Sequence, residues 1–301
     1  MNRSAPRSID QYLRQLREEL AGEDPALIQD ALYDAEEYLR AEVAAHPEKS
    51  EADILEIIAS TYGAPDEVAA AYRDTEIKVK AAMTTPVRKR AESAAGRFFG
   101  VYSDPRAYTA LFFMILSLAT GIIYFTFTVV GLSVSAGLAV LVVGVPFFLL
   151  FIGIARVISL AEGRLIEAMT GVRMPRRPPH PGAPGGFWSR VAGMLTDRRT
   201  WSTLLYLVLM LPLGIAYFVI AVVGLTVSMS LIFAPLVGLA DHIGILSTDQ
   251  VHLSPEWIGA LWALPFLFAL GVLLLTTLMH VSRGIGRLHA GYAKALLVAR
   301  G

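Results

Sequence analysis

Residues 107–155 read AYTALFFMILSLATGIIYFTFTVVGLSVSAGLAVLVVGVPFFLLFIGIA, and none of these 49 residues carries a charge. A charged side chain near the centre of a bilayer costs about 2.5 to 3.5 kcal/mol, so an uncharged apolar run of this length is typical of lipid-embedded sequence. One membrane-crossing helix needs roughly 20 apolar residues, and the run is therefore long enough for two. We expect spans near 108–130 and 134–156, joined by a tight turn at 131–135.

A second run, residues 200–282, contains no Lys or Arg although the chain has 26 of them. Its acidic residues stand in one polar segment that divides the run: Asp241, Asp249 and Glu256. We expect spans near 201–224 and 257–281, with 226–256 as an excursion on the outer side. Residues 231–240 are apolar but too few to cross a bilayer, which favours a re-entrant or interfacial segment.

All Lys and Arg residues lie in three segments, 1–106, 156–199 and 283–301. With four spans these segments share one side of the membrane, and the positive-inside rule makes that side cytoplasmic. We therefore predict a multi-pass membrane protein with both termini in the cytoplasm. The mean hydropathy of +0.53 argues against the alternative, a water-soluble helical protein.

The two apolar runs resemble each other when residues 104–135 are aligned with 197–228, because nearly half of the aligned positions are identical. The matches include glycines and tyrosines, which apolar composition alone does not place in register. Each copy contains two spans, so both enter the membrane in the same orientation, and a pseudo-two-fold axis along the membrane normal is expected. The fold class predicted is all-α, with a membrane domain of two parallel-repeat hairpins behind a small helical domain.

Residues 1–85 form an acidic segment with 18 Asp and Glu against 9 Lys and Arg. Capping residues at Ser8, Asp24 and Ser50 predict three helices, and Pro65 starts a fourth that should end near residue 75. The short turn before Pro65 also suits a helix-turn-helix, but an acidic domain would be repelled by phosphates, so nucleic-acid binding is excluded. Docking onto a basic protein surface is the use we expect for this charge.

The remaining segments complete the domain organisation. A basic linker and a Pro/Gly-rich linker flank the first hairpin, and helices at 156–170 and 186–196 have the composition of interfacial helices. The proline run suits either a hinge or a recruitment motif. The predicted organisation is an acidic cytoplasmic domain at 1–85, a basic linker at 86–106, the first hairpin with its interfacial helix at 107–173, the Pro/Gly-rich linker at 174–186, and the second hairpin with the outer insertion 226–256 and a cytoplasmic tail at 187–301.

The sequence contains no phosphate-binding glycine loop, no nucleophile elbow, no zinc-protease motif and no cysteine. We therefore expect no enzymatic activity and no cofactor. The outer segment gathers imidazole and carboxylate groups whose spacing fits no standard metal site. We predict no metal there and treat them instead as a candidate sensing surface: Asp241, His242, Asp249, His252 and Glu256.

Two segments of the acidic domain, YLRQL at 12–16 and YGAPDEVA at 62–69, resemble the bacterial HAAS signalling domain. The sequence YSDPR at 102–106, the paired Gly-Ile-x-Tyr-Phe segments and RMPR at 173–176 resemble the sensor-domain family of membrane proteins. The first resemblance implies association with a PadR-like transcriptional regulator or an export system such as an ABC transporter. The second implies a sensing role, although the kinase modules into which such relatives continue are not seen in this sequence.

The resulting hypothesis is a non-enzymatic sensor that relays an envelope or lipid cue to a cytoplasmic partner, with membrane lipids as its surroundings and homo-oligomerisation left open. The candidate docking turn consists of Tyr62, Gly63, Pro65, Asp66 and Glu67. The alternative is a transport or export component, disfavoured because His280 is the single ionisable residue expected inside a span. An intramembrane enzyme acting on lipid is a third, weaker alternative, since no buried acid–base pair is visible in the sequence.

Overall fold

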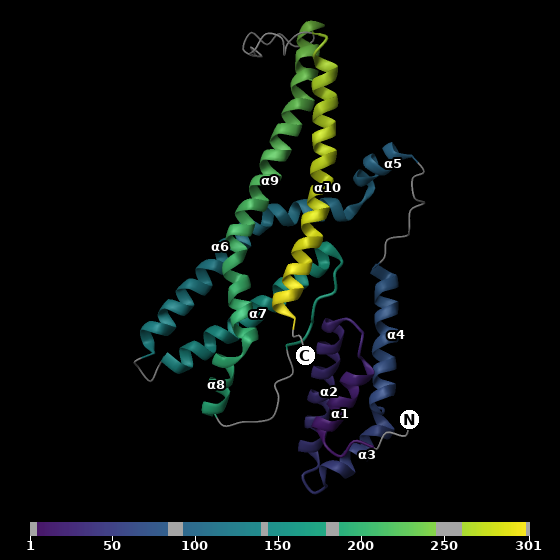
Figure 1. Ribbon diagram of the computed structural model, residues 1–301, viewed down its shortest axis with the longest axis vertical. Helices are drawn as coiled ribbons and strands as arrows, with labels where there is room; N and C mark the ends of the chain where they lie inside the picture. Colours follow the sequence, from purple (N-terminus) through teal and green to yellow (C-terminus); the bar gives the residue numbers. More distant parts are fainter. Residues whose placement is uncertain (1–4, 84–92, 140–143, 179–186, 245–260, 299–301) are drawn as a thin grey trace. The chain divides into compact units, whose positions relative to one another are not determined.

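The computed structural model describes residues 5–83, 93–139, 144–178, 187–244 and 261–298 (Figure 1). Within these residues all regular secondary structure is helical, which confirms the all-α prediction. The helices are α1 (Ile9–Glu19), α2 (Pro25–Ala45), α3 (Glu51–Thr61), α4 (Pro65–Met83), α5 (Ala94–Phe99), the 3-10 helix η1 (Gly100–Ser103), α6 (Pro105–Leu138), α7 (Gly144–Thr170), α8 (Phe187–Thr196), α9 (Arg198–His242) and α10 (Leu264–Leu297).

The chain divides into two compact units. The head unit comprises Met1–Arg88, Gly131–Tyr206 and Ala290–Gly301, and therefore joins α1 to α4 with α7 and with the ends of α9 and α10. The crossing unit comprises Lys89–Val130 and Leu207–His289, and contains most of α6, α9 and α10.

The four N-terminal helices begin where their capping residues predict. The side chains of Ser8 and Ser50 each accept a hydrogen bond from the backbone N–H three residues later, and Asp24 caps a helix whose first residue is proline. Gly63 adopts the left-handed conformation, φ +114°, at the turn after α3. One boundary is wrong: α4 was expected to end near residue 75 and continues to Met83.

The α1–α4 core is an apolar cluster drawn from all four helices. Tyr12, Leu16, Leu39 and Ile58 are almost completely buried in it. The Tyr12 hydroxyl is buried and donates to the carbonyl of Gly63 at 2.8 Å, which ties α1 to the α3–α4 turn.

In the part of the chain that the structure describes, four helices are long and apolar enough to cross a membrane, namely α6, α7, α9 and α10. Each contains an 18-residue window with a mean hydropathy of at least 2.1. Their number and composition identify a multi-pass membrane protein and agree with the four predicted spans.

The predicted turn at 131–135 is wrong, because α6 continues through these residues to Leu138. Gly131 serves packing at this position. A Cβ atom there would come within 2.2 Å of the Phe151 ring on α7, so only glycine lets the two helices approach. The glycine was taken as a signal for a turn although its role is close helix packing.

The predicted break after residue 224 is wrong for the same reason. Gly224 lies inside α9, where a Cβ would meet the Leu278 side chain of α10 at 2.8 Å. Residues 231–240 continue α9, so they do not form a separate re-entrant segment, and Leu231 and Ile232 pack against Gly271 of α10. At 1.5 Å per residue the 45-residue α9 is about 68 Å long, more than the thickness of a bilayer with its headgroups.

Two further expectations are corrected in part. Residues 156–170 are helical, but they continue α7 rather than forming a separate interfacial helix. The helix predicted after the proline-rich linker is confirmed as α8. The last apolar helix, α10, begins at Leu264, and the predicted start of that span near 257 lies outside the described residues. Within the basic linker, α5 and η1 are the elements described.

Within the crossing unit, α6 and α9 touch through a reciprocal pair of glycines. A Cβ on Gly121 would lie 2.7 Å from the carbonyl oxygen of Met210, and a Cβ on Gly214 would lie 2.2 Å from that of Ser117. The two glycines occupy equivalent positions in the sequence alignment, and so do Ser117 and Met210. The contact is thus the same when the two helices are exchanged.

The N-terminal ends of α6 and α9, which we call the two helix entries, also have the same local hydrogen bonds. Asp104 accepts the N–H of Arg106 at 3.0 Å, and Asp197 accepts that of Arg199 at 3.0 Å. An aromatic side chain then reaches back six residues in each copy, Tyr108 to the carbonyl of residue 102 and Trp201 to that of residue 195.

Candidate functional site

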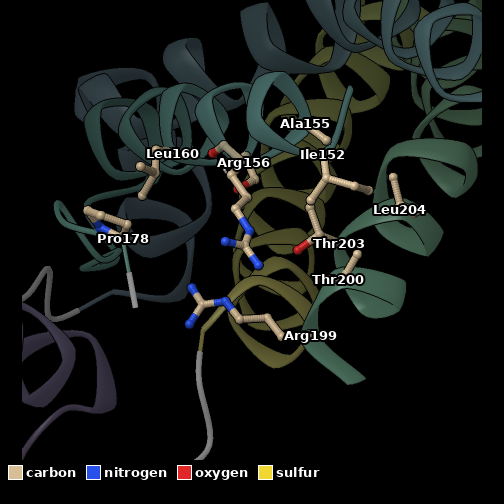
Figure 2. Close-up of a pocket in the computed structure, with 10 residues that line it drawn as sticks. Ile152, Ala155, Arg156, Leu160, Pro178, Arg199, Thr200, Thr203 and Leu204 are labelled. Atoms are coloured by element: carbon tan, nitrogen blue, oxygen red, sulfur yellow. Dashed lines mark hydrogen bonds between the residues drawn. The ribbon is translucent and has the colours of Figure 1, made fainter. Parts of the chain in front are cut away.

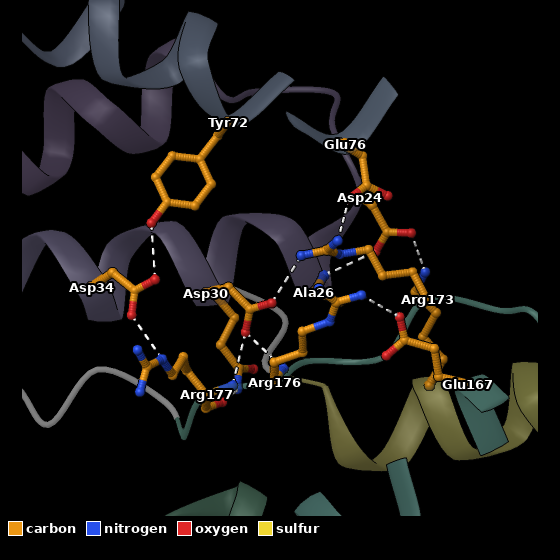
Figure 3. Close-up of polar contacts among 12 residues, drawn as sticks. Asp24, Ala26, Asp30, Asp34, Tyr72, Glu76, Glu167, Arg173, Arg176 and Arg177 are labelled. Atoms are coloured by element: carbon orange, nitrogen blue, oxygen red, sulfur yellow. Dashed lines mark hydrogen bonds and ion pairs between the residues drawn. The ribbon is translucent and has the colours of Figure 1, made fainter. Parts of the chain in front are cut away.

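A short segment after α7, residues 171–178, carries three arginines to the acidic face of α2 (Figure 3). Gly171 ends the helix with φ +71°, a conformation that favours glycine, and its N–H bonds to the carbonyl of Glu167 at 2.9 Å. Met174 is fully buried and packs close to Gly163 of α7. These two residues anchor the segment, which we call the arginine loop, directly to the end of a membrane helix.

Asp30 of α2 is the centre of the contact. Its Oδ1 accepts the backbone N–H of Arg176 at 2.7 Å and that of Arg177 at 2.9 Å, while Oδ2 accepts the Arg173 guanidinium at 2.9 Å. The residue is 4 % exposed, so these bonds are made in a largely water-free setting. One carboxylate therefore holds the backbone and a side chain of the arginine loop together.

Arg173 lies between two carboxylates from different helices. Its guanidinium bonds to Asp30 of α2 and to Glu76 of α4, and all three side chains are almost completely buried. Glu76 is in the part of α4 that lies beyond the predicted end of the helix. The extension of α4 thus supplies the second acid of the site.

The rim of the contact is more exposed. Arg177 pairs with Asp34 at 2.8 Å and lies over the ring of Tyr33 at 5.7 Å, with about half of its side chain in solvent. Asp34 also accepts the hydroxyl of Tyr72 at 2.9 Å, and Gln29 donates to the carbonyl of Arg177 at 2.6 Å. Residues 29, 30, 33 and 34 share one face of α2, as helical spacing requires.

Burial governs the electrostatics of the site. It raises the pKa of Asp30 above the usual range for a carboxyl group, although the N–H groups of Arg176 and Arg177 and the charge of Arg173 act in the opposite direction. Burial and the neighbouring Asp34 carboxylate also raise the pKa of the Tyr72 hydroxyl. The site is therefore held by hydrogen-bonded polar groups with little access to water.

Two more membrane helices reach the N-terminal half of α2. Lys294, near the end of α10, pairs with Asp24 at 2.5 Å. Arg199, in the first turn of α9, donates to the Gln29 side chain at 3.1 Å and to the carbonyl of Leu297 at 2.9 Å. The ends of α7, α9 and α10 therefore all meet one helix of the acidic domain.

Sequence reasoning anticipated that the acidic domain would dock onto a basic protein surface, and did not find that such a surface lies in the same chain. The signals were present as acids at i and i+4 on α2, Asp30 and Asp34, and as three arginines at 173–177. Neither signal indicates its partner, because the two segments are more than 130 residues apart.

The candidate sensing surface is only partly described. His242 is exposed at the end of α9, and Asp241 precedes it in the same helix turn. Asp249, His252 and Glu256 lie outside the described residues. Among the residues that are described, no group of three His, Asp or Glu side chains is arranged to hold a metal ion.

The candidate docking turn is largely engaged within its own domain. Tyr62 stacks on Tyr38 with ring centroids 4.3 Å apart, Gly63 accepts the Tyr12 hydroxyl, and Pro65 is buried. Asp66 and Glu67 are exposed, and Glu67 also accepts the N–H of Ala64 at 3.1 Å. Docking of a partner at this turn stays a prediction that rests on these two acids.

Two ionisable side chains that sequence reasoning did not weigh are buried in the long apolar helices, while the expectation for His280 stays a prediction. Glu162 of α7 is completely buried and accepts the hydroxyl of Tyr206 on α9 at 3.0 Å. His289 of α10 is 1 % exposed and packs against the rings of Phe113 and Tyr217. Both escaped notice because the helices that carry them extend beyond their predicted ends.

A family model described as "Putative sensor" matches residues 113–297, more than half of the chain. No curated protein and no solved structure matches.

Proposed function

The chain belongs to this sensor family, and we propose that it is a non-enzymatic sensor of the bacterial inner membrane that relays a signal to a cytoplasmic partner. In this proposal both termini are cytoplasmic, and the paired hairpins respond to an envelope or lipid cue. The four apolar helices support the membrane location, and family membership supports the sensing role.

The observation that carries the proposal is the contact of Asp30 with the arginine loop. Only Gly171 and Val172 separate the last residue of α7 from Arg173, so a displacement of α7 is transmitted to α2 with little slack. Contacts of Arg199 and Lys294 with the same helix let α2 respond to α9 and α10 as well. The acidic domain is the relay element, and its resemblance to the HAAS domain supports a PadR-like regulator or an ABC transporter as the partner.

Affinity capture from bacterial membranes tests the relay. Four baits are compared: the wild-type chain, a deletion of residues 1–83, Asp30→Arg, and Asp10→Arg, an exposed charge reversal on α1 that serves as the matched control. We expect the wild type and Asp10→Arg to capture the same cytoplasmic protein in equal amounts. The deletion should capture none of it, and its yield should change severalfold with Asp30→Arg. If the wild type captures no cytoplasmic protein that the deletion lacks, the proposal is wrong.

A transport or export function is the second candidate, and the buried Glu162 favours it. An ionisable residue buried in a membrane helix is a functional-site hypothesis by default, and Tyr206 is its partner here. Flux of a solute into proteoliposomes that contain this chain alone, lost in Glu162→Gln, would favour transport over signalling.

A further inference from the structure

A cavity of about 20 Å³ lies between α7 and the first turns of α9 in the head unit (Figure 2). Two guanidinium groups, those of Arg156 and Arg199, extend into it from opposite helices. Three hydroxyl side chains, Ser159, Thr200 and Thr203, complete its polar lining, and the Thr203 hydroxyl points toward the two guanidinium groups.

The cavity carries more positive than negative charge. Arg156 has a long ion pair with Asp197, at 3.8 Å. Within the described residues, the hydrogen bonds of the Arg199 guanidinium go to uncharged oxygens, the Gln29 side chain and the Leu297 carbonyl. Two cations facing one carboxylate leave an excess charge that an anion would balance.

The equivalent place in the first copy lacks this polar lining. Thr200 and Thr203 align with Ala107 and Ala110, and all four residues are at most 5 % exposed. The Thr200 hydroxyl donates to Asp197 Oδ2 over a long 3.5 Å. Alanine fills both positions in the first copy, so apolar packing alone does not require a hydroxyl there. The two threonines are a feature of the second copy only, where the two arginines converge.

The size and position of the cavity limit the ligand. A volume of about 20 Å³ admits little more than one water molecule or one phosphoryl oxygen, so the rest of a ligand must stay outside. Both helices are apolar enough to cross a membrane, and beside the cavity Val157 and Leu205 expose at least half of their surface. Basic pockets between membrane helices on the cytoplasmic side bind the headgroups of anionic lipids.

We infer that this cavity is a binding site for a phosphate group, held by Arg156, Arg199 and the hydroxyls of Thr200 and Thr203. An anionic phospholipid is the source that the apolar surroundings favour, and a soluble phosphate is the other source of the same chemistry. Because Arg199 also holds Gln29 of α2, occupancy would bear directly on the contact between the membrane helices and the acidic domain. That consequence rests on the proposed relay, whereas the binding itself does not.

The test measures lipid binding to the purified full-length chain by native mass spectrometry and by thermal stabilisation, with no partner present. The variants are Arg156→Gln, Arg199→Gln and the double change Thr200→Ala with Thr203→Ala, which reproduces the lining of the first copy. Arg106→Gln is the matched control, because Arg106 is the equivalent of Arg199 and is exposed. The probes are phosphatidylglycerol in phosphatidylcholine, pure phosphatidylcholine, and inorganic phosphate.

We expect the wild type and Arg106→Gln to bind phosphatidylglycerol in preference to phosphatidylcholine. Arg156→Gln and Arg199→Gln should each bind phosphatidylglycerol about tenfold more weakly, because each loses one charge-assisted hydrogen bond. The threonine double variant keeps the cations and the fold, and a severalfold loss is expected from it. Stabilisation by inorganic phosphate that the same variants abolish would support the site and assign it to a soluble ligand. Equal losses in Arg106→Gln and Arg199→Gln, or no binding of either probe by the wild type, would overturn the inference.

Discussion

Asp30 meets the arginine loop through charged side chains and backbone N–H groups, whereas Gly121 and Gly214 bring α6 and α9 together backbone to backbone. The first contact is polar, and its strength depends on charge. The second depends on the absence of side chains, and no change of charge can loosen it. In the proposed relay, the glycine contact is the fixed frame and the polar contact is the junction that a signal can change.

The largest effect is expected from Arg173→Ala in the polar contact. This change leaves the carboxylates of Asp30 and Glu76 buried without their cation, which costs about 3 to 5 kcal/mol. Arg177→Ala is the control, since its side chain is half-exposed and its ion pair contributes about 1 kcal/mol or less. Chemical unfolding of the acidic domain in detergent measures both, and equal losses would show that burial of the pair does not matter.

The glycine contact should respond to size alone. Gly121→Ala and Gly214→Ala each place a methyl group within 2.7 Å of a backbone carbonyl on the facing helix, and we expect each to cost about 1 to 3 kcal/mol. Gly153→Ala has open space and should be neutral or slightly stabilising. Thermal unfolding in detergent compares the three. Tolerance of Gly214→Ala equal to that of Gly153→Ala would mean that α6 and α9 do not cross at these glycines.

The two helix entries offer a finer comparison. Asp104→Ala and Asp197→Ala each remove a capping carboxylate, at an expected cost of about 1 kcal/mol. Each acid also pairs with an arginine, so the two costs should be similar. Thermal unfolding of the two single variants tests whether the entries are energetically equivalent, as a duplicated hairpin predicts. A clear difference between them would count against the duplication.

The smallest effect is the pH dependence of the stability that Asp30 contributes in the polar contact. Because the pKa of Asp30 is raised in the folded state, the folded protein holds this proton more tightly than the unfolded chain does. The stabilisation that protonated Asp30 contributes is therefore complete below the ordinary carboxyl pKa. It is lost as the pH rises through the pKa of Asp30 in the folded protein. The stability of the wild type relative to Asp30→Asn should fall from pH 4 toward neutrality. A rise over this interval would show that the arginines outweigh burial.

Several parts of the fold could be predicted because their signals are local. Capping residues such as Ser8 and Asp24 mark the starts of their helices within a few residues of sequence. Apolar runs predict membrane helices by their length. Glycines inside those helices misled the prediction, since a glycine that ends a helix and one that admits a neighbour look alike in sequence. Gly131 and Gly224 are of the second kind, and this fact became visible only with Phe151 and Leu278 in place.

The site could be predicted only in part. The acidity of the first domain indicated a basic partner, but RMPR at 173–176 was noted only for its family resemblance and not as that partner. That Asp30 receives Arg173 depends on the fold of two segments far apart in the chain, and local sequence contains no information on their pairing. The Thr200 and Thr203 lining was visible as a departure from Ala107 and Ala110, but its meaning required the position of Arg156 on another helix.

Hydrogen exchange at the backbone amides of Arg176 and Arg177 tests the central claim most directly, because both donate to Asp30 Oδ1. The full-length chain in detergent is compared with Asp30→Ala and with Asp34→Ala, which leaves these two bonds intact. Slow exchange in the wild type and in Asp34→Ala, and fast exchange in Asp30→Ala, is the predicted result. Equal exchange rates in all three proteins would contradict the docking of the acidic domain on the arginine loop.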